Sequence, residues 1–189
     1  MLKPQDIVLL LKLIANKEHL TWSQNQLAVH LCMSQSEVNA AMKRLNLSGL
    51  LQPSFDAQSF SPNLSGIEEF LLHGFKYIFP VCLKEYTRGV ATSYAAPIFK
   101  NQIVIGDEPI PVWPYAEGQV RGLALEPLYS SVPKSVIKYP DPEFYDLLAL
   151  IDIIRQGRAR ERNIAMQLLQ NKLRDNQHES KLNQDLIKS

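Results

Sequence analysis

The 189-residue sequence contains only two cysteines, Cys32 and Cys82, which is too few for a disulfide framework. Both stand next to apolar residues, and we expect them to be buried thiols. No apolar run reaches the length of about 20 residues that a membrane-spanning helix needs. The first residues, MLKPQDIVLLLKLIANK, carry charges within the apolar run and are not followed by a cleavage site, so we expect no signal peptide. We therefore expect a protein of the cytoplasm that has no membrane partner.

The sequence also has almost no excess of one sign of charge. The formal net charge is +1, and residues 1–65, 66–142 and 143–189 are each nearly neutral. Because Lys and Arg side chains that neutralise phosphates supply much of the affinity for nucleic acids, a strongly basic nucleic-acid binder is excluded. Binding to DNA would depend on a few local cations, which favours a homodimer that doubles the phosphate contacts.

The common catalytic motifs are missing. The sequence has no glycine-rich phosphate loop, no HExxH, no paired cysteines at metal-ligand spacing and no GxSxG. We therefore expect no enzymatic activity, no cofactor and no metal site. His73 has no partner at ligand spacing, which predicts a structural role for this histidine.

The sequence does contain a helix-turn-helix pattern in residues 27–51, LAVHLCMSQSEVNAAMKRLNLSGLL. Cys32 and Met33 separate two short stretches of helical periodicity and predict a tight turn. Ser34 stands at an N-cap position with Glu37 three residues later, and this capping box begins the second helix. The apolar faces of the two helices are Leu27, Ala28 and Leu31, and Val38, Met42 and Leu45.

Two helices joined by such a turn can place the second helix in the major groove of DNA. The outward positions of the second helix are Gln35, Ser36, Asn39, Ala40 and Lys43. We assign contacts with double-stranded DNA to Ser34, Gln35, Ser36, Asn39 and Lys43, with Arg44 on a phosphate. The alternatives are a helical hairpin that only packs a core, and the same fold used for protein contacts.

This stretch resembles the winged helix-turn-helix family of bacterial transcriptional regulators of the MarR type, whose second helix usually reads LSxSxVSxALxxLxxxGLL. The matching residues are Met33, Ser34, Ser36, Val38, Asn39, Ala41, Met42, Leu45, Gly49, Leu50 and Leu51. The resemblance covers the N-terminal third of the chain. It implies that residues 1–65 form a winged helix-turn-helix DNA-binding domain of a regulator that acts as a repressor.

The residues before this pattern predict another helix. Pro4 suits the first turn of a helix, and the apolar residues after it recur at helical spacing over residues 4–16. Thr21 or Ser23 can cap the following helix. Trp22 is placed to cover the inner face of that helix, and we expect it to belong to the core.

After the pattern, Gly49 is expected to end the second helix in the left-handed conformation, and a short strand should follow. Residues 52–61 contain no Lys or Arg, whereas a wing that grips DNA normally carries a basic side chain. This departs from the family pattern and leaves open whether the wing contacts DNA. Phe55 and Phe60 can pack against the domain instead.

The rest of the chain, residues 66–175, is predicted to form a linker helix and a C-terminal module. The linker helix should cover residues 63–79. Nine of the twelve prolines lie in residues 80–142, which excludes long helices there. Short strands or extended segments are expected at 102–106 and 111–113, and the aromatic residues of this segment argue against disorder.

The C-terminal part begins with a strong helix signal. Asp141 and Pro142 suit an N-cap and a first helical turn, and the helix that follows has a wide apolar face over 143–155. Gly157 should interrupt this helix. The polar tail, residues 176–189, is expected to fray.

Five arginines are candidate contacts for an anion or a protein partner: Arg88, Arg121, Arg158, Arg160 and Arg162. Arg88 and Arg121 each precede a glycine that lets the backbone turn. They can bind a carboxylate or phosphate, or they can be buried clamps that pair with Glu117, Glu126 or helix-end carbonyls.

The cluster of Arg158, Arg160 and Arg162 has three interpretations. It can be a solvated face with Glu161 and Asp152 as partners, a phosphate contact beside the DNA-reading helix, or a contact for an anionic protein or RNA.

These patterns predict a mainly α fold with minor β structure. They indicate a homodimeric, sequence-specific DNA-binding regulator that dimerises through apolar surface from 63–79 or 143–155. The alternative is an antitoxin-like interaction protein whose C-terminal module binds a neighbouring gene product while the N-terminal domain represses its own operon. A ligand sensor is a third option, for which the sequence indicates no ligand.

Overall fold

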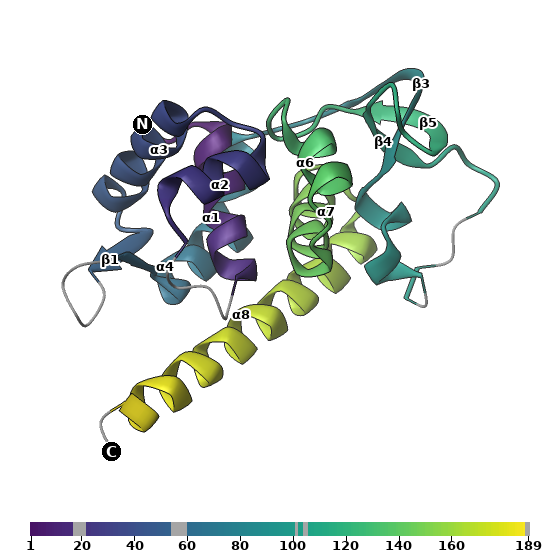
Figure 1. Cartoon of the computed structure of the whole chain (residues 1–189). Coiled ribbons are helices and arrows are strands. Elements are labelled where there is room, and N and C mark those ends of the chain that lie inside the picture. Colours follow the sequence, from purple (N-terminus) through teal and green to yellow (C-terminus); the bar gives the residue numbers. More distant parts are fainter. Residues whose placement is uncertain (17–21, 54–59, 101, 104–105, 188–189) are drawn as a thin grey trace.

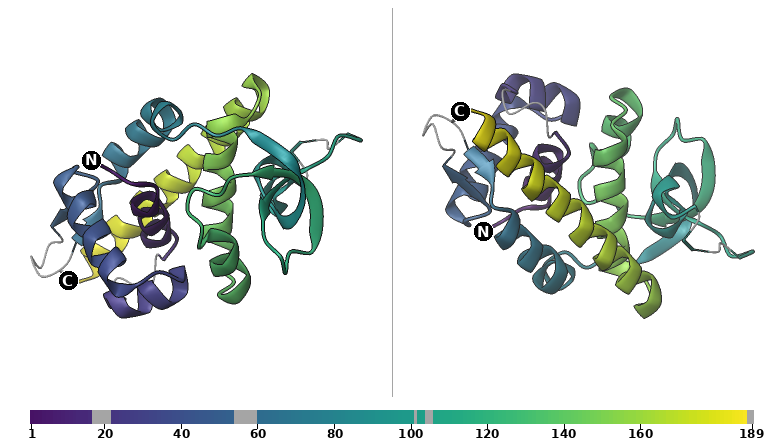
Figure 2. Two further views of the ribbon diagram at one scale, coloured as in Figure 1. Left: turned by 90° about the horizontal axis from the view of Figure 1, so that it is seen from above. Right: turned by 90° about the horizontal axis from the view of Figure 1, so that it is seen from below.

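The computed structural model describes residues 1–16, 22–53, 60–100, 102–103 and 106–187, with side chains up to Asn176. The fold is mainly helical with two small sheets, as the sequence predicts. The N-terminal helices and a small sheet formed within residues 83–125 lie on opposite sides of α6 (Val132–Lys138) and α7 (Pro142–Gln156). Helix α8 (Ala159–Ile187) crosses beneath them (Figures 1 and 2). None of the described helices is both long and apolar enough to cross a membrane.

Three helices open the chain: α1 (Pro4–Ala15), α2 (Gln24–Leu31) and α3 (Gln35–Leu47). All three match the sequence prediction. Ser23 caps α2, because its hydroxyl accepts a hydrogen bond from the Gln26 N–H at 3.2 Å. The other candidate cap, Thr21, lies outside the described residues. Trp22 is half-buried against the core, as expected.

A hairpin follows α3. Gly49 ends the helix with φ of 74°, and the Leu50 N–H donates to the Leu45 carbonyl at 3.1 Å, which completes a Schellman motif. Strand β1 (Leu51–Pro53) then pairs antiparallel with β2 (Phe60–Pro62). Phe60 is 45% exposed, so the expectation that it packs against the domain is wrong. Phe55 lies outside the described residues.

The predicted linker helix is present as one run of three pieces. Asn63 caps α4 (Leu64–Glu69), which continues through a π-helical turn, η1 (Phe70–Gly74), into α5 (Phe75–Ile78). The inward face packs on the core through Ile67, Leu71, Leu72 and Phe75. The extra backbone residue of the π turn was not indicated by the apolar spacing.

A small closed sheet of three strands follows: β3 (Leu83–Ala91), β4 (Pro111–Pro114) and β5 (Val120–Leu125). Strand β3 runs antiparallel to both neighbours, and β4 and β5 are parallel. Strand β4 confirms the prediction at 111–113. Residues 102, 103 and 106 are not in a strand, so the strand alternative is wrong at these positions, and 104–105 lie outside the described residues.

Closure of this sheet depends on two glycines where the backbones nearly touch. A Cβ atom at Gly89 would lie 2.0 Å from the Trp113 carbonyl oxygen, and one at Gly122 would lie 1.9 Å from that of Ile110. Any side chain at either position would push the strands apart. The glycines after the two arginines therefore permit close strand contact inside β3 and β5, and they do not mark turns.

Three helices complete the chain: α6 (Val132–Lys138), α7 (Pro142–Gln156) and α8 (Ala159–Ile187). Helix α6 was not predicted. Asp141 caps α7 as expected, because its carboxylate accepts the Phe144 N–H at 3.1 Å. Helix α8 continues to Ile187, through residues that the sequence predicted to fray.

The predicted domains 1–65 and 66–175 share one apolar core. The buried cluster runs from α1 through α7 to the sheet, with Leu10, Leu147 and Trp113 at most 1% exposed. An ion pair of 2.7 Å joins Lys12 of α1 to Asp141 at the start of α7, and Lys12 is only 2% exposed. The residues before and after the predicted boundary near residue 65 therefore pack against each other in one core.

Both cysteines are free thiols. Cys32 is half-buried in the turn after α2, where it adopts a φ of 52°. Cys82 is exposed. The expectation that both thiols are buried is therefore wrong for Cys82.

Candidate nucleic-acid interface

The outer face of α3 carries the polar side chains that the sequence assigns to DNA contact. Gln35, Ser36, Asn39 and Lys43 are all exposed, whereas Ala40 is half-buried. The opposite face buries Val38, Ala41 and Leu45 against α1 and α2. Three residues separate α3 from α2. The helix therefore presents a continuous row of hydrogen-bonding groups to solvent while its other face anchors it to the core.

The start of α3 is fixed by the predicted capping box. The Ser34 hydroxyl accepts the Glu37 N–H at 3.2 Å, and the Glu37 carboxylate accepts the Ser34 N–H at 2.8 Å. Ser34 is exposed, but its hydroxyl also donates to Glu37 at 2.7 Å. Ser34 thus serves first as the cap of α3.

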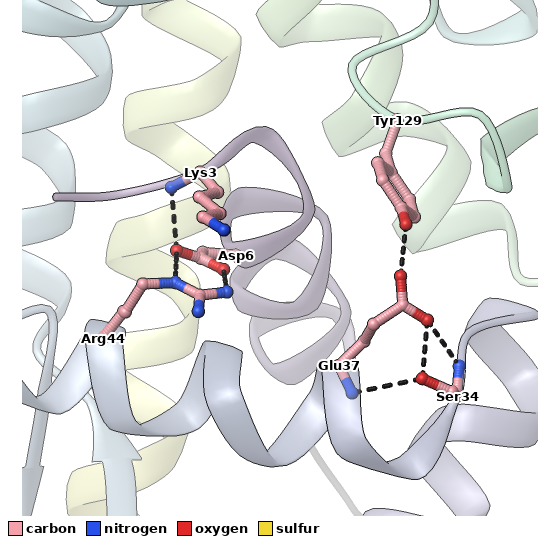
Figure 3. Close-up of polar contacts among 6 residues, drawn as sticks. All are labelled: Lys3, Asp6, Ser34, Glu37, Arg44 and Tyr129. Atoms are coloured by element: carbon pink, nitrogen blue, oxygen red, sulfur yellow. Dashed lines mark hydrogen bonds and ion pairs between the residues drawn. The ribbon is translucent and has the colours of Figure 1, made fainter.

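A residue from the C-terminal part also holds this first turn. The Tyr129 hydroxyl, from the segment between β5 and α6, donates a hydrogen bond to the Glu37 carboxylate (Figure 3). This bond, together with those from Ser34, lowers the pKa of Glu37 below its ordinary value. The sequence indicated Tyr129 only as one of several aromatic residues, because no pattern of neighbouring residues connects it with α3.

Arg44 faces inward, which corrects its assignment to a DNA phosphate. Its Nε donates to Asp6 Oδ2 at 2.7 Å and its Nη2 donates to Oδ1 at 2.6 Å (Figure 3). Asp6 is fully buried in the first turn of α1 and also accepts the Lys3 N–H at 2.8 Å. The hydrogen bond to Asp6 raises the pKa of Arg44. Arg44 therefore joins α3 to α1, and Lys43 is the exposed cation of α3.

The three arginines around the start of α8 do not form one cluster with shared partners. Arg158 pairs with Glu108 at 3.1 Å, while its backbone N–H donates to Glu161 at 3.0 Å. Arg162 donates to the Gly157 carbonyl at 2.8 Å, and Arg160 is exposed. Glu161 is thus a partner as predicted, but through a backbone N–H.

Asp152, the other predicted partner of that cluster, is buried in the core. Its carboxylate accepts hydrogen bonds from the Thr92 hydroxyl at 2.7 Å and from Trp113 Nε1 at 2.6 Å, and it pairs with Arg155 at 3.0 Å. Burial raises the pKa of Asp152. The prediction of a surface role is wrong, because this carboxylate joins α7 to β4 and to the end of β3.

Arg88 and Arg121 are both exposed, so the interpretation as buried clamps is wrong. They stand opposite each other on β3 and β5. Glu126, one of their proposed partners, pairs with Lys84 at 2.6 Å. The two guanidinium groups are therefore free to meet a partner outside the chain.

Comparison with known proteins adds no relative. No family model, curated protein or solved structure matches this chain. Within the described part of the chain, no three His, Cys, Asp or Glu side chains are grouped so that they could hold a metal ion. His73 is exposed.

Proposed function

We propose that this protein is a sequence-specific regulator of transcription, acting as a repressor, that binds double-stranded DNA through α3. The observation that carries the proposal is the exposed polar row of Gln35, Ser36, Asn39 and Lys43 on a capped helix that follows a three-residue turn. Helix α3 is the counterpart of the recognition helix of the winged helix-turn-helix family, and the hairpin β1–β2 is the counterpart of its wing.

The chemistry of this row suits base edges. An Asn amide can form two hydrogen bonds with adenine, and Lys can donate to guanine or to a phosphate. Ser36 and Gln35 lie in the first turn of α3, the part of a recognition helix that usually reaches the bases. The hairpin contributes no cation, because residues 51–62 contain neither Lys nor Arg. Base recognition therefore rests on α3.

The protein acts as a homodimer in this proposal. A nearly neutral monomer has few phosphate contacts, and two copies double them. The apolar face of 143–155 packs inside its own chain, so it is not available to a second copy. Exposed apolar side chains remain at the end of α5, where Tyr77 is 74% and Ile78 is 54% exposed. We assign the dimer contact to this surface.

A second candidate function is an antitoxin-like protein whose C-terminal part binds a neighbouring gene product. The hydrogen bond from Tyr129 to Glu37 favours this candidate, because it would couple partner binding to DNA binding. A partner that moves the segment around Tyr129 would act directly on the first turn of α3. Co-purification with the product of the adjacent gene, followed by mass measurement, tests this candidate.

Footprinting on the protein's own upstream DNA, at a stated salt concentration, tests the main proposal. Asn39→Ala should relax the preference at one base pair by about 1–3 kcal/mol, and Lys43→Ala should weaken binding. Asn171→Ala is the matched control, because Asn171 is an exposed asparagine on α8, away from the proposed DNA-contacting row of α3. Equal footprints for the wild type and for the Asn39 and Lys43 variants would refute the assignment.

A dimer is tested separately. Sedimentation at tens of micromolar should give the mass of two chains, since a modest interface already associates in that range. Tyr77→Ser combined with Ile78→Ser should return a monomer. A wild-type monomer at these concentrations would contradict the proposed dimer.

A further inference from the structure

Arg88 and Arg121 form a pair of adjacent cations on the β3–β5 sheet. They stand directly opposite each other where β3 pairs antiparallel with β5, so their side chains lie on one face, and both are exposed. The Cβ atoms of such pairs are about 5 Å apart, and like charges at this spacing repel each other. The pair therefore does not stabilise the fold.

No carboxylate in the described part of the chain pairs with either arginine. Another cation of β3, Lys84, does have such a partner, because it pairs with Glu126 at 2.6 Å. Arg88 and Arg121 differ from Lys84 in this respect, although they lie on the same sheet. Two adjacent positive charges without an internal counter-charge attract an anion from outside the chain.

An aromatic ring extends the face that carries the two arginines. Tyr86 lies two residues before Arg88, in a part of β3 that pairs regularly, so the two side chains point to the same side. Tyr86 is 56% exposed, and the Arg121 guanidinium lies 5.8 Å from the centre of its ring. Tyr and Arg are among the side chains that most often carry the affinity of protein interfaces. We call Tyr86, Arg88 and Arg121 the arginine face.

The sheet that carries the arginine face is separated from the DNA-reading helix. It lies on the other side of α6 and α7 from the N-terminal helices, which include α3 (Figures 1 and 2). The arginine face and the polar row of α3 are therefore two separate surfaces, and each can be occupied without the other.

One edge of β3 beside the arginine face has no neighbouring strand. In the described part of the chain, β5 pairs with β3 along residues 83–89, whereas β4 pairs with it only along 89–91. The Arg88 carbonyl accepts the Tyr115 N–H at 3.1 Å, so it points to the β4 side, away from β5. By the alternation of a strand, the backbone N–H and carbonyl of Tyr86 point to the same side, beyond the end of β4. An extended segment from outside the chain can pair with this edge.

We propose that the arginine face binds an acidic, extended segment of a partner protein, which adds to the free edge of β3. Side chains alternate along such a segment, so carboxylates at every second position would lie on the side of Arg88 and Arg121. Each guanidinium can donate two parallel hydrogen bonds to a carboxylate. The strand edge supplies backbone hydrogen bonds, and the arginines supply the preference for acidic side chains. This inference goes beyond the proposed function, because it does not require α3 to bind DNA.

Charge argues against a second copy of this chain as the occupant. Pairing of two such edges would place two arginine faces side by side, and their guanidinium groups would repel each other. A DNA duplex has no extended peptide backbone that can pair with a strand edge. The formal net charge of +1 gives the chain little general attraction for acidic proteins, so the attraction is local to the arginine face.

Fluorescence polarisation with full-length protein tests the proposal, and the probe is a short labelled peptide of alternating glutamate and threonine. The wild type should bind this peptide with a Kd below about 1 mM. Arg88→Gln combined with Arg121→Gln should weaken binding at least about tenfold, because charge-assisted hydrogen bonds are lost. Arg174→Gln, at an exposed arginine of α8, is the matched control and should bind like the wild type. A wild type that does not bind, or equal affinity for the double variant and the control, would overturn the proposal.

Two modified peptides test the strand edge. Residues whose side chains face the arginines direct their N–H groups toward β3 in this pairing, so N-methylation of the glutamate amides should abolish binding. N-methylation of the threonine amides should be tolerated, because these amides point away from β3. If the two modified peptides bind equally, the segment does not add to β3 as a strand.

Folding is checked in the same preparations. The double glutamine variant should melt at or above the wild-type temperature, because it removes a cross-strand repulsion. If it unfolds, Arg88→Gln and Arg121→Gln are tested singly, and each should weaken peptide binding about tenfold. Single variants that fold and keep the wild-type affinity would overturn the proposal.

Two further ligands distinguish an acidic segment from other occupants. A peptide of alternating glutamine and threonine should bind more weakly than the glutamate peptide, and equal affinities would refute the role of charge. A mixed-sequence DNA duplex should bind the double glutamine variant as it binds the wild type. If the duplex loses as much affinity as the peptide does, the occupant is DNA and the proposal is wrong.

An α3 variant separates this proposal from the proposed function. Asn39→Ala with Lys43→Ala should leave peptide binding unchanged, because neither residue belongs to the arginine face. Loss of DNA binding alone in this variant leaves the arginine face in place, and loss of peptide binding alone in the double glutamine variant leaves the role of α3 in place. Loss of peptide binding in the α3 variant would contradict the separation of the two surfaces and overturn the proposal.

Discussion

The Tyr129 hydroxyl donates a hydrogen bond to the Glu37 carboxylate across 92 residues of sequence. Glu37 also belongs to the capping box of α3 with Ser34. The first turn of the proposed DNA-reading helix is therefore held from within the helix and from the C-terminal part of the chain. Any rearrangement of the segment before α6 must break this bond or move α3 with it.

Tyr129→Phe should lower the free energy of unfolding by about 1 kcal/mol at pH 7, because it removes one hydrogen bond and keeps the ring. The bond lowers the pKa of Glu37 below 4.5 in the folded state. Its contribution is thus complete above pH 4.5 and is lost as the pH falls through the lowered folded-state pKa. Urea unfolding at pH 7 and pH 3 measures both values.

Tyr86→Phe is the control for that experiment, because Tyr86 is exposed and its hydroxyl has no hydrogen-bond partner in the described part of the chain. It should unfold like the wild type at both pH values. A loss of stability in Tyr129→Phe that is the same at pH 3 as at pH 7 would contradict the pairing with Glu37.

Arg44→Ala should lower the free energy of unfolding by about 3 kcal/mol, because it leaves the buried Asp6 carboxylate without its cation. Lys43→Ala, the neighbouring change at an exposed cation, should alter stability by less than about 0.5 kcal/mol. Urea unfolding compares the two. If Arg44→Ala is as stable as Lys43→Ala, the fork with Asp6 does not hold α3 to α1.

The features that the sequence predicted are those with local causes. The capping box of Ser34 and Glu37 and the left-handed Gly49 each depend on residues within a few positions, so α2, α3 and the start of β1 could be predicted. The contact of Arg44 with Asp6 spans 38 residues, and no local pattern indicates it. The hydrogen bond from Tyr129 to Glu37 likewise joins residues that are far apart in the sequence.

Strands β3 and β5 were missed for a related reason. Arg-Gly pairs are typical of turns, but Gly89 and Gly122 lie inside strands. Their role is set by carbonyls of Trp113 and Ile110, which come from another strand or its flank. A glycine needed for close approach can be distinguished from a turn glycine only when its partner is known.

Asp152→Ala should lower the free energy of unfolding by about 4 kcal/mol, because the nearly buried Arg155 guanidinium would lose its counter-charge. Thr92 and Trp113 would also lose their acceptor. Asp175→Ala, at an exposed aspartate of α8, is the control and should change stability little. Thermal unfolding that shows similar melting temperatures for both variants would mean that Asp152 does not join α7 to the sheet.

Gly122→Ala should lower the free energy of unfolding by about 3 kcal/mol, since the new methyl group would lie 1.9 Å from a backbone carbonyl that can move only if the strands part. Gly106→Ala is the matched control, because a Cβ atom there has no neighbour within 4 Å. It should leave stability unchanged or raise it by about 0.5 kcal/mol, since alanine restricts the unfolded chain. Urea unfolding measures both changes. Equal effects at the two glycines would show that the β3–β5 sheet does not close as tightly as the structure has it.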